Sequence, residues 1–180
     1  PPRPAPGSPP GSSAATSDAA EPPLAPDPHS PRIENDPYSI SIDITTDSAT
    51  RRSGDLSQVY NLLSKTHRKG DVTLVYVQWS AIYTARTWRF YNRASNDKGQ
   101  SYDFRQVNRD VHGCPSSRCV YNETYNIIVP PADLRRGATE GIRFKIYARN
   151  GGDVLVEIPA SLVAQFNEKL AEVRKMRTGS

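Results

Sequence analysis

The fold is decided most clearly by the stretch IRFKIYARNGGDVLVEI, residues 142–158. Along most of it, apolar side chains alternate with basic, aromatic or acidic ones, which is the period of a strand with one buried face. In its middle stands Asn150-Gly151, a dipeptide that accepts the positive φ angles of a tight hairpin turn. The stretch therefore predicts two antiparallel strands, at 142–149 and 153–158, joined by a short turn.

The same alternation recurs in the part of the chain that precedes this hairpin. Further strands are predicted at 38–44, 72–83, 88–93, 102–107 and 119–129. The run at 72–83 is apolar on both faces, so we expect a central strand that is covered on both sides. Pro130 and Pro131 end the last of these strands, because proline cannot donate a hydrogen bond to a neighbouring strand.

Two segments have apolar residues at helical spacing instead. Residues 53–65, with Ser53 as an N-cap, predict a short helix. A closing helix is predicted after Pro159, with an apolar stripe made of Leu162, Val163, Phe166, Leu170 and Val173. Together these elements predict a mainly β fold. We expect an antiparallel sandwich-like or α+β sheet of about six to seven strands, with a short helix on the N-terminal side and an amphipathic helix at the C-terminus.

The first 37 residues differ in composition from the rest of the chain. They hold twelve of the sixteen prolines, and their only large aliphatic residues are Leu24 and Ile33. Such a segment buries too little apolar surface to offset the entropy that is lost on ordering. We therefore expect a disordered tether over residues 1–37 and one folded β-rich domain over residues 38–180. The tether has a net charge of −3 and the domain one of +7, within a total of +4.

The two cysteines, Cys114 and Cys119, lie in one turn-rich loop between two predicted strands. A disulfide between them would close a loop of six residues and stabilise the fold by about 2 kcal/mol in the chain-entropy model. The alternatives are two reduced thiols or half of a zinc site. Zinc is disfavoured because His112 is the only histidine nearby and the second pair of ligands is absent. We expect the disulfide, which indicates an oxidising compartment.

Two strands carry basic residues interleaved with aromatic ones, and these side chains are the candidate surface for a ligand or partner. They are Arg89, Tyr91 and Arg93 in the first strand and Arg143, Lys145, Tyr147 and Arg149 in the second. Aromatic rings stack on sugars or bases, and guanidinium groups bind phosphate or carboxylate in forked pairs. The alternative is an ordinary solvated sheet face, in which long arginine stems shield the strands beneath.

No catalytic or cofactor motif accompanies this surface. Glu123 and Glu157 lie within strands, and we expect both carboxylates to point into solvent, as charged side chains normally do. Gly151-Gly152 leads into a strand and lacks the helix N-terminus that phosphate-binding loops use. We therefore predict that the protein is not an enzyme and holds neither a metal nor a cofactor.

A Pro/Ser/Ala-rich tether followed by a folded domain resembles the layout of bacterial outer-membrane lipoproteins, in which a lipidated cysteine precedes the tether. The resemblance covers residues 1–37 and their position before the domain. The chain starts at Pro1 rather than at Met, which we interpret as removal of a leader or a cut within a longer chain. The resemblance implies a periplasmic or cell-surface location, with membrane attachment through an N-terminal anchor that this chain does not include.

The favoured hypothesis is therefore a tethered extracytoplasmic module with a binding or structural role. Its partner would be a protein or an anionic component of the cell envelope. No apolar run reaches the ~20 residues of a transmembrane helix. The alternative hypothesis is a cytoplasmic protein that binds nucleic acid or another polyanion through the basic–aromatic surface, because a domain charge of +7 favours anionic partners.

Overall fold

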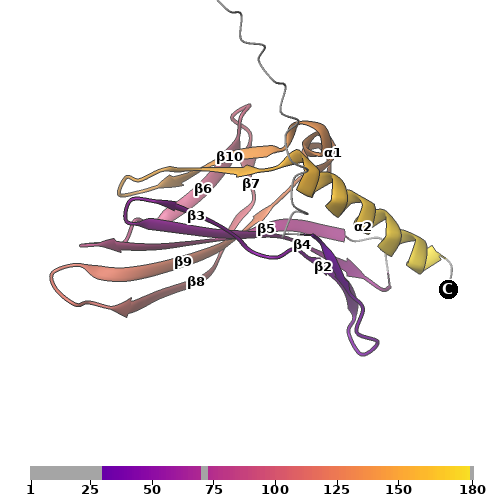
Figure 1. The fold of residues 1–180 in the computed structure, drawn as a ribbon, viewed down its shortest axis with the longest axis horizontal. Helices are drawn as coiled ribbons and strands as arrows, with labels where there is room; N and C mark the ends of the chain where they lie inside the picture. Colours follow the sequence, from indigo (N-terminus) through magenta and orange to yellow (C-terminus); the bar gives the residue numbers. More distant parts are fainter. Residues whose placement is uncertain (1–29, 70–72, 179–180) are drawn as a thin grey trace, which may run out of the picture.

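The computed structural model describes residues 30–69 and 73–178, and this part of the chain is mainly β, as predicted. Two antiparallel sheets pack face to face, with two helices beside the smaller sheet (Figure 1). The larger sheet contains β1 (Arg32–Glu34), β2 (Ser41–Thr45), β3 (Ala49–Ser53), β4 (Leu56–His67), β5 (Thr73–Ala85), β8 (Phe104–Gly113) and β9 (Cys119–Ile128). The smaller sheet contains β6 (Tyr91–Asn96), β7 (Ser101–Tyr102), β10 (Ile142–Ala148) and β11 (Val154–Ile158). The helices are α1 (Pro131–Glu140) and α2 (Ala160–Thr178).

The strand order leaves two sheet edges close to each other. The larger sheet runs β1-β2-β4-β5-β9-β8, with β3 paired to the first half of β4, and the smaller sheet runs β11-β10-β6-β7. Strand β8 is therefore one edge of the larger sheet. In the smaller sheet, β7 pairs only with Ala94 and Ser95 of β6. Within the described chain, the first half of β6 thus has no strand partner on that side.

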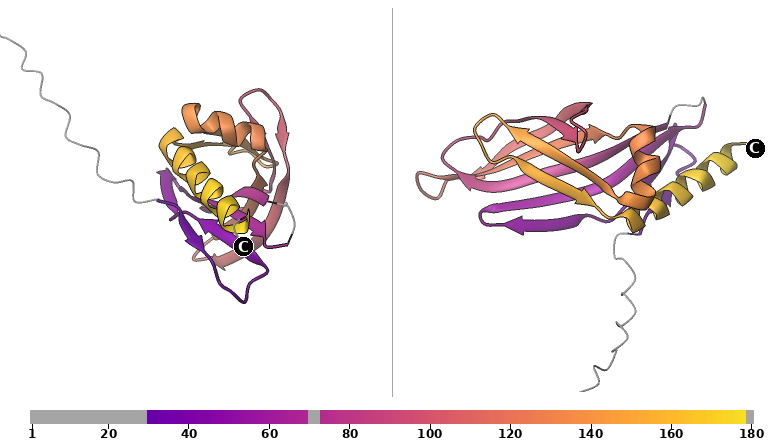
Figure 2. Two further views of the ribbon diagram at one scale, coloured as in Figure 1. Left: turned by 90° about the vertical axis from the view of Figure 1, so that its right-hand side faces the viewer. Right: turned by 90° about the horizontal axis from the view of Figure 1, so that it is seen from above.

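The core lies between the sheets and beneath α2. Seen from above, the smaller sheet covers one end of the larger sheet, and α1 and α2 lie at the other end (Figure 2). The predicted C-terminal helix is confirmed, and its apolar stripe is buried at Leu162, Val163, Phe166, Leu170 and Val173. Helix α2 packs against α1, β1 and β2.

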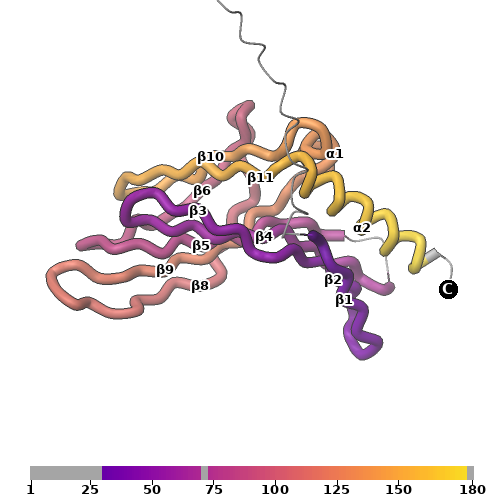
Figure 3. The backbone as a smooth tube through the Cα atoms, viewed as in Figure 1, coloured from indigo at the N-terminus to yellow at the C-terminus, as the bar shows by residue number. Residues whose placement is uncertain are grey.

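The hairpin predicted from residues 142–158 is confirmed. Strands β10 and β11 pair antiparallel and lie above the larger sheet (Figure 3). Positive φ angles occur at Gly151 (77°) and Gly152 (85°), rather than at Asn150. The side-chain amide of Asn150 instead donates a hydrogen bond from Nδ2 to the backbone oxygen of Trp88 at 2.7 Å. The turn therefore contacts the segment that leads into β6.

The helix predicted over residues 53–65 is wrong, because this segment forms most of β4. Its apolar residues are divided between the two faces of the strand, and Leu56 and Leu62 are buried in the core. The inward row also includes Gln58, which accepts a hydrogen bond from Trp79 Nε1 at 3.3 Å. Pairing with β2, β3 and β5 outweighs the helical spacing of the sequence, because packing against neighbouring strands decides strand formation.

Two strand predictions in the larger sheet are corrected by the structure. The strand predicted at 72–83 is the central strand β5, but its residues alternate between buried and half-buried, and Leu74 is exposed. The smaller sheet and the helices cover only one face of the larger sheet, so the expectation of burial on both faces is wrong. The strand predicted at 38–44 is shorter, since β2 begins at Ser41. The side chains of Tyr38 and Ile40 are exposed.

Three further elements differ in extent from the prediction. The strand predicted at 102–107 is divided between β7 and β8, and the strand at 119–129 corresponds to β9. Helix α1 is absent from the sequence prediction, which takes Pro130 and Pro131 only as the end of a strand. It begins at Pro131, where a missing N–H is tolerated, and ends at Glu140. The next residue, Gly141, caps the helix with a φ of 75°, which suits glycine.

Strand β1 lies within the range that the composition assigned to the tether. It pairs with β2, and the half-buried Ile33 packs against the core. The ordered sheet therefore begins at Arg32. Residues 1–29, on which most of the tether prediction falls, lie outside the described residues.

Candidate functional site

The seven residues of the predicted basic–aromatic surface lie in three places. The outer face of the smaller sheet carries Arg93, Arg143, Lys145 and Tyr147. Arg89 and Tyr91 turn toward the space between the sheets, where Tyr91 is only 2% exposed. Arg149 follows β10 and lines a cavity.

A change in backbone direction separates these groups. Phe90 has a φ of 54°, and it is the only residue other than glycine with a positive φ in the described chain. This left-handed conformation interrupts the alternation before β6, so Arg89 and Arg93 do not share a face. Such conformations are costly for residues with a side chain and persist only where surrounding contacts impose them.

The outer face of the smaller sheet is cationic but partly neutralised. The guanidinium carbon of Arg93 lies 3.9 Å from the ring centre of Tyr147, and Lys145 Nζ lies 4.9 Å from the same centre. Lys145 also forms an ion pair with Asp153 at 3.0 Å. Hydrogen bonds from the Ala148 amide and from Lys145 lower the pKa of Asp153, which keeps this carboxylate ionised.

Glu123 lies inside the fold, so the expectation that it points into solvent is wrong. Its side chain on β9 is fully buried. Its Oε1 accepts hydrogen bonds from Tyr83 Oη (2.5 Å) and from the backbone N of Phe90 (3.1 Å). Its Oε2 accepts from Tyr125 Oη (2.6 Å) and from Arg109 Nη2 (3.1 Å) and Nε (3.3 Å). We call these five residues the Glu123 cluster. A buried carboxylate is tolerated when it is paired and hydrogen-bonded, and this one is both.

Arg109 on β8 is the cationic partner of Glu123 across the β8–β9 pair. Its Nη2 also donates to Tyr125 Oη at 3.0 Å, and its guanidinium carbon lies 4.9 Å from the ring centre of Phe90 and 5.5 Å from that of Trp88. Partial burial lowers the pKa of Arg109, but the contacts with Tyr125 and Glu123 raise it by more. The side chain therefore remains cationic, and 24% of it is exposed.

The two phenols of the cluster act as fixed donors. Burial, reinforced by the Glu123 carboxylate, raises the pKa of Tyr83 and of Tyr125 well above the usual value. Both hydroxyls therefore stay protonated at neutral pH and donate to Glu123. The Tyr83 oxygen in turn accepts a hydrogen bond from the backbone N of Arg89 at 2.7 Å. Tyr83 and Glu123 thus hold two consecutive backbone N–H groups, those of Arg89 and Phe90.

The side chain of Arg89 braces the same region. Its Nη1 donates to Tyr91 Oη at 3.2 Å, and its Nη2 pairs with Asp55 at 3.3 Å. Its guanidinium carbon lies 4.6 Å from the ring centre of Tyr83. Because the Arg89 guanidinium is engaged by Tyr91, Tyr83 and Asp55, and Tyr91 is buried, we assign both residues a role in positioning the start of β6.

A cavity of about 420 Å³ opens beside the Glu123 cluster, between the edge strand β8 and the first half of β6. Its lining consists of Phe90, Tyr91, Asn92, Phe104, Gln106, Arg109, Tyr125 and Arg149. Phe104 stacks on Tyr125, with ring centres 4.4 Å apart. The volume lies within the range of small-molecule sites, and the lining combines aromatic rings with polar and cationic side chains.

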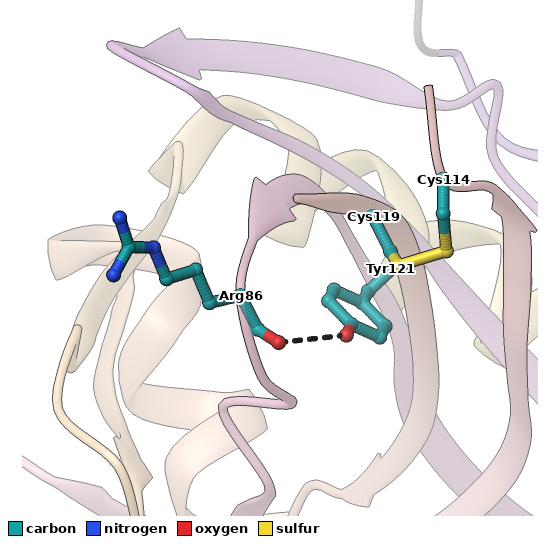
Figure 4. The surroundings of a disulfide bond; sticks show 4 residues. All are labelled: Arg86, Cys114, Cys119 and Tyr121. Atoms are coloured by element: carbon teal, nitrogen blue, oxygen red, sulfur yellow. Dashed lines mark hydrogen bonds between the residues drawn. A yellow bond between two sulfur atoms is a disulfide. The ribbon is translucent and has the colours of Figure 1, made fainter. Parts of the chain in front are cut away.

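The predicted disulfide between Cys114 and Cys119 is present and closes the loop between β8 and β9 (Figure 4). Next to it, Tyr121 Oη donates to the backbone oxygen of Arg86 at 3.3 Å, which connects this hairpin to the segment after β5. In residues 30–69 and 73–178, no group of three potential metal ligands comes together. No helix in the same part of the chain has the length and apolarity needed to cross a membrane.

Sequence reasoning found Tyr91 and Arg149 but missed the rest of the cavity lining. One signal was available for Glu123, because Tyr121, Glu123 and Tyr125 alternate and must share a face of one strand. Two aromatic neighbours indicate that this face is the buried one. No sequence signal of this kind indicates Arg109, because its role depends on Glu123 in the neighbouring strand β9.

No protein-family model, no curated protein and no solved structure matches this chain.

Proposed function

We propose that this protein is a tethered extracytoplasmic binding module and that the cavity beside the Glu123 cluster holds its ligand. One observation carries the proposal: aromatic rings and two arginines line an open cavity over a fully buried, fully hydrogen-bonded carboxylate. Rigid surroundings of this kind reduce the cost of ordering a site when a ligand binds.

The extracytoplasmic part of the proposal is supported by the disulfide and by the resemblance of the layout to lipoproteins. Disulfides persist in oxidising compartments and are rare in the cytosol. Mass spectrometry of freshly isolated native protein, with free thiols alkylated before reduction, tests this part. We expect Cys114 and Cys119 to escape alkylation until a reductant is added. Alkylation of both thiols in the untreated protein would argue for a reducing compartment.

Binding is favoured over catalysis by the bonding of the buried acid. Both oxygens of Glu123 accept hydrogen bonds from the protein itself. An acid or base that transfers protons needs direct access to the reacting group. Glu123 is fully buried, and we assign it a positioning role.

A fragment titration followed by amide NMR tests the cavity. Small aromatic compounds that are neutral, cationic or anionic are added separately to the folded protein. We expect at least one class to shift the signals of Phe90 to Asn92, of the first half of β8 and of Arg149. The proposal fails if no class shifts these signals, or if every shift falls on the outer face of the smaller sheet.

The alternative function, binding of nucleic acid or another polyanion, draws support from the outer face of the smaller sheet. Arg93 and Arg143 are exposed there, and neither forms an ion pair within the described residues. Polyanion binding falls steeply with salt, by roughly one log unit of affinity per log unit of salt for each phosphate contacted. Unchanged retention of the double variant Arg93→Ser/Arg143→Ser on heparin would remove this alternative.

A further inference from the structure

We infer that the cavity selects an organic acid made of a flat ring system and one carboxylate. This inference rests on the proposed function, because it names the ligand class of the same site. It follows from the donors that the protein leaves unused, from the charges around the cavity and from the orientation of its rings.

Arg109 contributes donors that the Glu123 cluster does not consume. Its Nε and Nη2 are engaged with Glu123 and Tyr125, whereas its Nη1 makes no hydrogen bond to any described residue. Nη1 carries two N–H groups. The side chain lines the cavity and is partly exposed. Because the other two nitrogens are held by Glu123 and Tyr125, Arg109 presents these donors without further loss of side-chain freedom.

Arg149 supplies the second guanidinium. Its backbone N donates to the backbone oxygen of Phe90 at 3.1 Å, which fixes the base of the side chain beside the cavity. Within the described part of the chain, the guanidinium itself has no hydrogen bond or ion pair. Arg149 therefore contributes a positive charge to the lining of the cavity that Arg109 also lines.

The charges around the cavity favour a ligand with one negative charge. The charge of Arg109 is matched by that of Glu123, whereas no acidic residue in the described part of the chain pairs with Arg149. None of the lining residues is acidic. A guanidinium binds a carboxylate through two parallel hydrogen bonds, which gives direction as well as attraction. A doubly charged phosphate monoester would exceed the single unmatched charge.

The rest of the lining favours a flat apolar body. Phe104 stacks on Tyr125 at an interplanar angle of 25°, and Phe90 lies against the guanidinium of Arg109. Flat rings pack on such surfaces in offset or edge-on arrangements. The backbone of Phe90 is held by hydrogen bonds with Glu123 and Arg149, so its ring is positioned before a ligand arrives.

The test measures the binding of three probes to the full chain by amide NMR and isothermal titration calorimetry. Naphthoate carries the ring and the carboxylate, naphthamide keeps the ring without the charge, and naphthyl phosphate carries two charges. We expect naphthoate to shift the signals of the cavity lining and to bind at least tenfold more tightly than naphthamide. It should also bind more tightly than naphthyl phosphate.

Variants with a matched control locate the effect. Arg149→Gln should weaken naphthoate about tenfold and leave naphthamide unchanged, because a charge-assisted hydrogen bond is lost. Arg143→Gln, which removes an exposed arginine from the outer face of the smaller sheet, should leave both probes unchanged. Phe104→Leu should weaken both probes by a similar factor.

The outcomes separate the ligand class from the site. Equal binding of naphthamide and naphthoate within the cavity would overturn the carboxylate inference and leave the proposed function standing. The carboxylate inference is also overturned, and the proposed function still stands, if naphthyl phosphate binds most tightly. The same conclusion follows if Arg149→Gln leaves the affinity for naphthoate unchanged, as Arg143→Gln should. If none of the three probes shifts the signals of the cavity lining, the inference fails. The proposed function then fails only if the wider fragment titration is also negative.

Discussion

The two long sides of the sandwich are joined in opposite ways. On one side, which we call the closed side, Tyr60 Oη of β4 donates to the backbone oxygen of Glu157 in β11 at 3.1 Å, and Arg51 pairs with the Glu157 carboxylate at 3.5 Å. On the other, which we call the open side, the Glu123 cluster links β5, β8 and β9 to the segment before β6, and a cavity remains. The closed side uses exposed polar contacts, whereas the open side depends on one buried charge.

This difference predicts very different sensitivities to mutation. An exposed ion pair contributes little because water already solvates both charges. A buried pair is costly to break, since the remaining partner keeps its desolvation cost without compensation. The open side should therefore be the weak point of the fold, and mutations there should cost more stability than matched mutations on the closed side.

The largest effect is expected from Glu123→Ala. It removes the acceptor of five hydrogen bonds and leaves Arg109, Tyr83 and Tyr125 without their partner, so the free energy of unfolding should fall by about 3–5 kcal/mol. Urea denaturation followed by tryptophan fluorescence measures the loss. The matched control is Glu157→Ala on the closed side, which should cost less than about 1 kcal/mol. Similar costs for the two variants would contradict the contrast.

A smaller effect is expected from Tyr83→Phe, which removes the hydrogen bond donated to the Glu123 carboxylate and the one accepted from the backbone N of Arg89. The loss should cost about 2 kcal/mol at neutral pH. Because the pKa of Tyr83 is raised in the folded state, its contribution is fully present below the unfolded pKa of 10.0. It is lost as the pH rises through the higher folded-state pKa.

The difference in stability between Tyr83→Phe and the parent protein should therefore shrink above pH 10. Urea midpoints at a series of alkaline pH values measure it, with phenolate absorbance as a check on ionisation. A difference that stays constant across this range would mean that Tyr83 is not held in its protonated form.

The double variant Cys114→Ser/Cys119→Ser should also lower stability by about 2 kcal/mol, through release of the loop between β8 and β9. The Glu123 cluster should survive, because Arg109 and Glu123 face each other directly in the β8–β9 register. Urea denaturation gives the stability, and the amide spectrum of the cavity lining reports on the cluster. Loss of the cavity signals in the folded variant would show that the disulfide, rather than Glu123, holds the open side.

The smallest effect is expected from Tyr60→Phe on the closed side. It removes one exposed hydrogen bond and should cost at most about 1 kcal/mol. Thermal unfolding of this variant beside Tyr83→Phe compares the two sides with the same chemical change. A larger loss for Tyr60→Phe than for Tyr83→Phe would reverse the assignment of the weak side.

The sequence predicts structure correctly where residues close together in the chain decide it. The hairpin β10–β11 depends on a glycine-containing turn between alternating runs, and the stripe of α2 depends on spacing within one helix. The disulfide needed only the proximity of two cysteines in one short loop. In each case the interacting residues lie close together in the sequence.

The predictions failed where a distant partner decides. Residues 53–65 form a strand because β2, β3 and β5 pair with them. The basic–aromatic surface is divided because Glu123, more than thirty residues away, holds the backbone of Phe90. Helical spacing and strand alternation carry no information about such partners.

Local periodicity and short loops are enough to predict the mainly β domain, its closing helix, its terminal hairpin and its disulfide. The burial of Glu123, its pairing with Arg109 and the cavity beside them become visible only in the folded molecule. A carboxylate can be buried only if donors from several strands converge on it. That convergence depends on how the strands are ordered and paired, which strand periodicity does not encode.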